Sequence, residues 1–204
     1  MSDELARRLV HASGATIPGV YLLDRYLFDA GIVTWRVVQA VCVAGVVLAG
    51  TLEAARLSGT MDHPIYDKLT REYEQDKVAG YALYVVSGTV VVLAFDPVVA
   101  VPALFMLTIG DPVSGILSTG ELRTLKRPRV LVGMFAVSLA FAYPFMRAAT
   151  ADPFVGTAAA VAGALGATLA DGVKPTIRDY VIDDNLTIPI VAAVAMQAVR
   201  FLGA

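Results

Sequence analysis

The chain has 204 residues, of which 57% are hydrophobic and 17% are charged. Soluble domains usually carry roughly 25% charged residues, so this composition excludes an ordinary soluble protein and indicates an integral membrane protein. The formal net charge of −2 gives no support to a nucleic-acid partner, and the single cysteine, Cys42, excludes an intramolecular disulfide and a Cys-based zinc site.

The apolar runs predict an all-α fold, a bundle of about seven transmembrane helices that forms a single polytopic membrane domain over residues 1–204. The first run is the weakest, because Ser13, Gly14, Thr16 and Pro18 interrupt it. In chain order the expected helices are Leu9–Leu23, Trp35–Ala55, Val78–Phe95, Pro97–Ser118, Val130–Ala148, Phe154–Gly172 and Leu186–Leu202.

The distribution of Lys and Arg predicts the orientation, because cytoplasmic loops carry an excess of positive residues. With the expected helices, the side of the N-terminus holds Arg7, Arg8, Arg56, Lys68, Arg71, Lys77, Arg123, Lys126, Arg127, Arg129, Lys174 and Arg178. The opposite side holds Arg25, Arg36, Arg147 and Arg200. We therefore expect a multi-pass protein of the cell membrane with a cytoplasmic N-terminus, an external C-terminus and a functional site on the cytoplasmic side.

A carboxylate lies inside the fourth apolar run, in the sequence Gly110-Asp111-Pro112-Val113-Ser114. Burying a charge in a membrane helix is costly unless the charge is paired or functional. One interpretation is a helix kink, in which Asp111 and Ser114 bond to backbone groups freed by Pro112. The other is a discontinuous helix, with Asp111 facing a polar cavity as a metal ligand or base.

The stretch that follows, residues 119–129, is rich in positive charge. Arg123, Lys126, Arg127 and Arg129 lie within a short loop, where they are suited to neutralising the phosphates of a nucleotide. The alternative is an ordinary positive loop that anchors the protein at lipid headgroups. The charge of the loop alone favours lipid anchoring. Its position directly after the Gly-Asp-Pro sequence supports phosphate binding, so both interpretations stay open.

A second acidic group, Asp183-Asp184-Asn185, directly precedes the last apolar run. Adjacent carboxylates repel each other, and a bound Mg²⁺ relieves that repulsion. Asp171 and Lys174 share the same loop and are expected to frame the same patch. The alternatives are a solvated acidic turn for the two aspartates and a helix N-cap for Asn185.

Near the N-terminus, Glu4, Arg8 and His11 share roughly one face of a helix. This face can line a polar cleft at the membrane surface. A histidine at a membrane boundary is more often a simple interfacial residue, so we expect these three side chains to support the site rather than to carry it.

Taken together, these motifs resemble the dolichol kinase and phytol kinase family of polyprenol kinases. The resemblance runs from Glu4 to Pro189 and is most specific in Asp183-Asp184-Asn185-Leu186-Thr187-Ile188-Pro189. The chain departs from the family at Ser114, where alanine is frequent, and at Asp171, where glutamate is common. The resemblance implies transfer of the γ-phosphate of a nucleotide, usually CTP, to an isoprenoid alcohol with Mg²⁺.

On this hypothesis the catalytic residues are Asp111 and Asp184, and the metal ligands are Asp111, Asp183 and Asp184. The nucleotide and phosphate ligands are Lys126, Arg127, Arg129, Asn185 and Lys174. The supporting residues are Glu4, Arg8, His11, Ser114 and Asp171.

Two other functions remain open on the sequence alone. A CTP-dependent cytidylyltransferase that makes a CDP-activated lipid, of the CDP-archaeol or CDP-diacylglycerol type, needs the same metal and nucleotide. A transporter of a small anion also uses broken helices and polar residues near the membrane midplane. We expect the partners to be the lipid substrate, a nucleoside triphosphate and the bilayer, and we leave a homodimer open.

Overall fold

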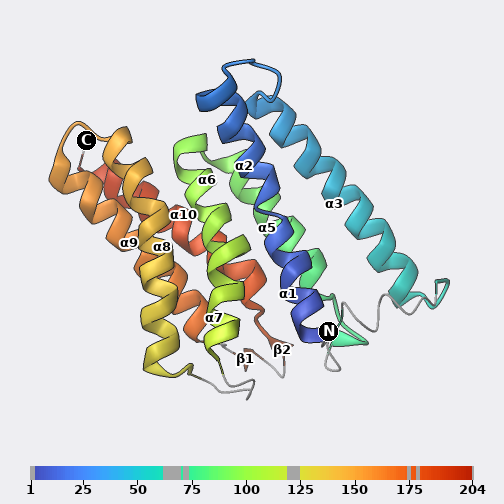
Figure 1. The fold of residues 1–204 in the computed structure, drawn as a ribbon. Helices are drawn as coiled ribbons and strands as arrows, with labels where there is room; N and C mark the ends of the chain where they lie inside the picture. Colours follow the sequence, from blue (N-terminus) through green and yellow to red (C-terminus); the bar gives the residue numbers. More distant parts are fainter. Residues whose placement is uncertain are drawn as a thin grey trace.

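The computed structural model describes residues 3–61, 70, 74–118, 125–173, 176–177 and 180–203. These residues are mostly helical, and a small hairpin of two-residue strands is the exception (Figure 1). The elements are α1 (Asp3–Ser13), α2 (Thr16–Leu22), the π-helical η1 (Leu23–Phe28), α3 (Trp35–Leu57), α5 (Gly80–Ala94), α6 (Pro97–Phe105), the π-helical η3 (Met106–Gly110), α7 (Asp111–Leu117), α8 (Pro128–Ala149), α9 (Pro153–Gly172), β1 (Thr176–Ile177), β2 (Tyr180–Val181) and α10 (Asp184–Leu202).

Within the described residues, five helical segments are long and apolar enough to cross a membrane. They are Trp35–Leu57, Pro97–Leu117, Pro128–Ala149, Pro153–Gly172 and Asp184–Leu202. The expectation of a helical membrane protein is confirmed at this level. The helix expected at Val78–Phe95 is the shorter apolar α5, with 15 residues, and the one expected at Leu9–Leu23 is divided into α1, α2 and η1. Seven crossings therefore stay a prediction.

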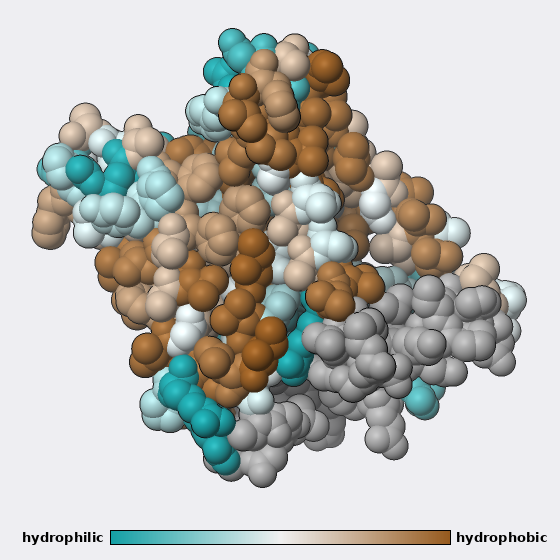
Figure 2. All heavy atoms as spheres, viewed as in Figure 1, coloured by the Kyte–Doolittle hydropathy of each residue, from teal (hydrophilic) through white to brown (hydrophobic). Residues whose placement is uncertain are grey.

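The surface agrees with a membrane setting. Figure 2 shows hydrophobic side chains over the middle of the molecule, with hydrophilic residues gathered nearer its two ends. The N-terminal end of α1 lies at the same end of the bundle as β1 and β2, whereas the C-terminus lies at the opposite end (Figure 1). Apolar side chains on the outside of such a bundle face lipid, so their exposure costs nothing there.

The core is formed by α8, α9 and α10 together with α6 and η3, and four methionines are among its largest buried side chains. Small residues on α9 let its neighbours approach closely. A Cβ on Gly156 would lie 2.8 Å from the carbonyl oxygen of Met146, and one on Gly163 would overlap the side chain of Met196. Close packing of α9 against both neighbours fixes its last turn, which carries Asp171.

The helix from Pro97 to Leu117 is continuous, so the expected discontinuity is not present. It widens into the π-helix η3 directly before Asp111, and the N–H of Asp111 bonds to the carbonyl of Met106 five residues earlier. Pro112 has no N–H to donate, so the chain there lacks one helix hydrogen bond. The π-helix accommodates this local change without ending the helix.

On the other side of the molecule α3 packs along α5, with Gly45 against Val85 (Figure 1). The buried carboxylate of Glu53 forms two bonds with the guanidinium of Arg56 and accepts the N–H of Ala79. The Arg56 guanidinium also donates to the carbonyls of Glu74, Gln75 and Lys77. This ion pair within α3 therefore also fixes the chain that leads into α5.

Candidate functional site

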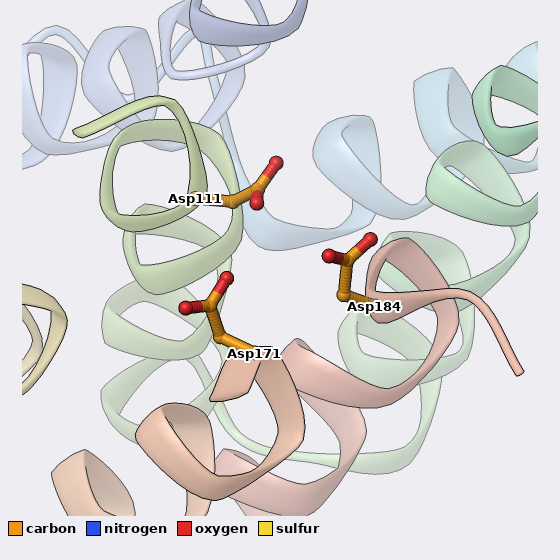
Figure 3. A group of neighbouring side chains, drawn as sticks. All are labelled: Asp111, Asp171 and Asp184. Atoms are coloured by element: carbon orange, nitrogen blue, oxygen red, sulfur yellow. The ribbon is translucent and has the colours of Figure 1, made fainter. Parts of the chain in front are cut away.

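Three aspartates from three helices meet at one end of the bundle. Asp111 begins α7, Asp171 lies in the last turn of α9, and Asp184 begins α10; Figure 3 shows their carboxylates turned toward a common space. One oxygen of each lies within 4.8 Å of the others. Asp171 and Asp184 are buried, at 0% and 3% exposure, whereas the Asp111 side chain is 21% exposed. The group is therefore open on the side of Asp111.

Lys126 provides a positive charge for this group. Its ammonium nitrogen donates to Asp171 Oδ1 at 2.6 Å and to Ser114 Oγ at 3.0 Å, and it lies 4.0 Å from Asp184 Oδ2. The Ser114 hydroxyl donates to the other oxygen of Asp171 at 2.7 Å. Both oxygens of the buried Asp171 carboxylate are thus satisfied, one by a hydroxyl and one by a cation.

The backbone holds Lys126 beside Asp171. Leu125 forms an antiparallel bridge with Val173, and the N–H of Lys126 donates to the carbonyl of Gly172 at 3.1 Å. This contact joins the end of the loop before α8 to the end of α9. Lys126, one of the expected phosphate ligands, therefore lies beside the acidic group.

The helix α1 brings Arg8 and His11 to the same region. The Arg8 guanidinium lies over Gly115, where a Cβ would approach its Nε to 3.1 Å. His11 Nε2 lies 3.0 Å from the carbonyl oxygen of Leu107 and 3.7 Å from Asp111 Oδ2. Because a carbonyl oxygen only accepts, His11 Nε2 carries a proton and donates. That nitrogen is therefore not available as a base.

The reason for the His11 contact lies in the π-helix. In the i→i+5 pattern the N–H of Asp111 bonds to Met106, so the carbonyl of Leu107 would next receive the N–H of residue 112. Residue 112 is proline, which has none. His11 takes over this bond, which ties α1 to the helix that carries Asp111.

The structure shows how Asp183 and Asn185 are arranged at the start of α10. The N-cap of α10 is Asp183, not Asn185: Asp183 Oδ1 accepts the backbone N–H of Asn185 at 2.9 Å and its side-chain Nδ2 at 2.7 Å. The backbone carbonyl of the buried Asn185 also accepts a hydrogen bond from the Ser87 hydroxyl. Asp183, predicted as a metal ligand, thus caps the helix and orients it, while Asp171 takes the third position in the acidic group.

For the remaining predicted residues the structure gives positions in the helices, except for one that lies outside the described part of the chain. Arg127 is the N-cap residue of α8 and Arg129 is exposed in its first turn, on the same end of the bundle as Lys126. Glu4 belongs to the first turn of α1. Lys174 lies outside the described residues.

The aspartate group suits a divalent cation. Mg²⁺ and Ca²⁺ prefer carboxylate oxygens, and opposite ligands of an octahedral Mg²⁺ are about 4.2 Å apart when each bond is roughly 2.1 Å. Oxygens that all lie within 4.8 Å of one another need only small shifts to reach such an arrangement. The donor set of Asp111, Asp171 and Asp184 therefore fits Mg²⁺.

Comparison with known proteins gives no independent indication of function. No family model, no curated protein and no solved structure matches the chain. The function has to be argued from the chemistry of the site.

Proposed function

We propose that the protein is a membrane-embedded kinase of lipid alcohols, which uses a nucleotide, CTP by preference, and Mg²⁺ to phosphorylate an isoprenoid alcohol such as dolichol. The observation that carries this proposal is the meeting of Asp111, Asp171 and Asp184 with Lys126 at one end of a bundle of membrane-length helices. The order of motifs that resembles the polyprenol kinases supports the same function.

Phosphoryl transfer asks a protein mainly to position the reactants and to neutralise charge. Asp111, Asp171 and Asp184 would hold a divalent cation, which would supply positive charge to stabilise the transferred phosphoryl group. Lys126 contacts Asp171 and Ser114, and Arg8 lies against Gly115 of the helix that carries Asp111. In the proposal they bind phosphate oxygens, with Arg127 and Arg129 at the rim.

Asp111 is suited to receive the proton of the lipid hydroxyl. It is the most exposed of the three carboxylates, and it lies on the side from which a substrate can approach. The alcohol oxygen forms a bond to the terminal phosphorus, the bond from that phosphorus to the bridging oxygen breaks, and the nucleoside diphosphate leaves. The hydroxyl proton passes to Asp111 and then to solvent.

The proposal includes a membrane arrangement. Seven crossings with a cytoplasmic N-terminus place the acidic group at the cytoplasmic surface, where the nucleotide is found. The long apolar tail then stays in the bilayer beside the bundle, and only the hydroxyl enters the site. A homodimer is compatible with this arrangement and is not required by it.

Product analysis tests the proposal. Detergent-purified protein is incubated with Mg²⁺, a panel of isoprenoid alcohols, and CTP labelled in the α- or γ-phosphate. We expect γ-label to move to the lipid and α-label to stay in CDP. In a parallel reaction, a lipid phosphate replaces the alcohol. Formation of a CDP-lipid with release of pyrophosphate in that reaction would instead identify a cytidylyltransferase. No chemical change in any reaction would refute both enzymes.

A further inference from the structure

Lys126 lies where a bound cation would balance the same carboxylates. Its ammonium group contacts Asp171 at 2.6 Å and faces Asp184 at 4.0 Å, and both are ligands of the proposed metal. We propose that Lys126 is an internal counter-ion of the metal site, which neutralises the aspartates before substrate binds and moves to the nucleotide phosphates when the metal–nucleotide complex enters. This inference rests on the proposed function.

The burial of the site supports such an exchange. Asp171 and Asp184 lie deep, at 0% and 3% exposure, whereas the side chains of Lys126 and Asp111 are 15% and 21% exposed. The ammonium group is therefore more exposed than the two carboxylates that it faces. Because Lys126 is partly open to solvent, its side chain has room to move.

The main chain of Lys126 is fixed by hydrogen bonds, whereas its side chain can move. The Leu125–Val173 bridge and the bond from Lys126 N–H to Gly172 hold the main chain of Lys126. A lysine side chain has four rotatable bonds and donates to several acceptors in turn. Its ammonium can thus leave Asp171 for a phosphate oxygen without displacement of the helices.

Electrostatic repulsion keeps the Lys126 ammonium and a divalent metal ion from sharing the same carboxylate oxygens. A divalent ion at Asp171 and Asp184 would lie close to the ammonium, and like charges at such a distance repel strongly in a partly buried site. The phosphates that accompany the metal offer new acceptors of opposite charge. Metal entry and lysine departure are therefore coupled, and the site favours a metal–nucleotide complex over the free metal.

The test measures binding of Mn²⁺ alone, without nucleotide, by the loss of the free-ion signal in electron paramagnetic resonance. The full chain is placed in nanodiscs of neutral phosphatidylcholine, which removes binding to anionic lipids. Lys126→Met removes the charge and keeps the length of the side chain. Lys126→Gln removes the charge but keeps a polar partner for Ser114 and Asp171, in case the methionine variant fails to fold. Arg36→Met removes one charge from the exposed start of α3, outside the proposed site, as a control.

We expect Lys126→Met and Lys126→Gln to bind Mn²⁺ at least about tenfold more tightly than the wild type, which is a usual size for coupling between two ligands. Arg36→Met should differ from the wild type by less than about twofold, and a further Asp171→Asn change in the Lys126 variants should abolish the gain. Equal or weaker Mn²⁺ binding by both Lys126 variants would overturn the exchange while leaving the metal centre intact. Absence of Mn²⁺ binding in every variant would overturn the exchange and the proposed function together.

Discussion

Removing Lys126 should destabilise the protein more than neutralising Asp171, although both changes break the same ion pair. The two charges are 2.6 Å apart, which corresponds to an attraction of about 6 kcal/mol at an effective dielectric constant of 20. Much of that attraction offsets the desolvation of both groups. The net effect of each substitution therefore depends on what the remaining partner can do.

In Lys126→Met, the Asp171 carboxylate stays buried, at 0% exposure, and has lost its cation. Among the described residues, Ser114 is then the hydrogen-bond donor that it keeps. A buried charge that loses its partner costs about 3–5 kcal/mol. Asp171→Asn leaves an ammonium group that is 15% exposed and accessible to water, and the amide oxygen can still accept from Ser114. We expect that change to cost about 1–2 kcal/mol. In the double variant the charge and its partner are both gone, so it should be more stable than Lys126→Met by roughly 1–3 kcal/mol.

Thermal unfolding in one detergent, followed by circular dichroism in metal-free buffer, measures these differences. About 2–4 °C in Tm corresponds to 1 kcal/mol for a chain of this size. Lys126→Met should therefore lower Tm by about 6–20 °C at a fixed scan rate. Equal losses for the two single variants, or a double variant whose loss is their sum, would refute the assignment of Lys126 as the partner of a buried charge.

Three further predictions concern the chemistry, the packing and the orientation. Asp111→Asn and Asp184→Asn should each lower turnover by at least about a hundredfold while Tm changes little, since each removes a charge from the reacting region; normal turnover of the folded variants would contradict their roles. Gly14→Ala should lower Tm, because its Cβ would lie 1.7 Å from the Tyr84 hydroxyl, whereas Gly19→Ala, with no atom within 4 Å, should leave Tm unchanged or raise it. In a Cys42→Ala background, a maleimide that does not cross membranes should label Ala151→Cys in intact cells and Ser58→Cys only after the cytoplasmic side is exposed; labelling of both in intact cells would exclude the proposed orientation.

Much of the site was visible in the sequence because carboxylates beside apolar runs are rare without a function. This argument identified Asp111 and Asp184, which the structure brings together with a third carboxylate. It did not separate Asp183 from Asp184, because neighbours in sequence carry the same signal. The start of α10 separates them: Asp183 has the extended backbone of an N-cap and bonds to the N–H of Asn185, whereas Asp184 is the first helical residue.

Asp171 was underestimated for a different reason. Its partners Ser114 and Lys126 are 57 and 45 residues away, so no local spacing predicts them. The available signal was the position of Asp171 at the end of an apolar run, on the same expected side as the other aspartates. For the helices, apolar length predicted the five long segments, and the interruptions in the first run marked it as the weakest. The close approach of Gly14 to Tyr84 joins residues far apart in the sequence, so no local pattern predicts it.

The missing N–H of Pro112 explains why His11 and Arg8 of α1 lie at the site. Without an N–H at residue 112, the widened helix leaves the carbonyl of Leu107 without its next helical donor. A buried carbonyl needs a partner, and His11 of α1 supplies one at 3.0 Å. Arg8 lies three residues before His11, on the same face of α1, so the contact that satisfies the carbonyl also brings the guanidinium over Gly115. The π-helix before Pro112 is thus the reason that α1 packs here and places the Arg8 guanidinium against the helix that carries Asp111.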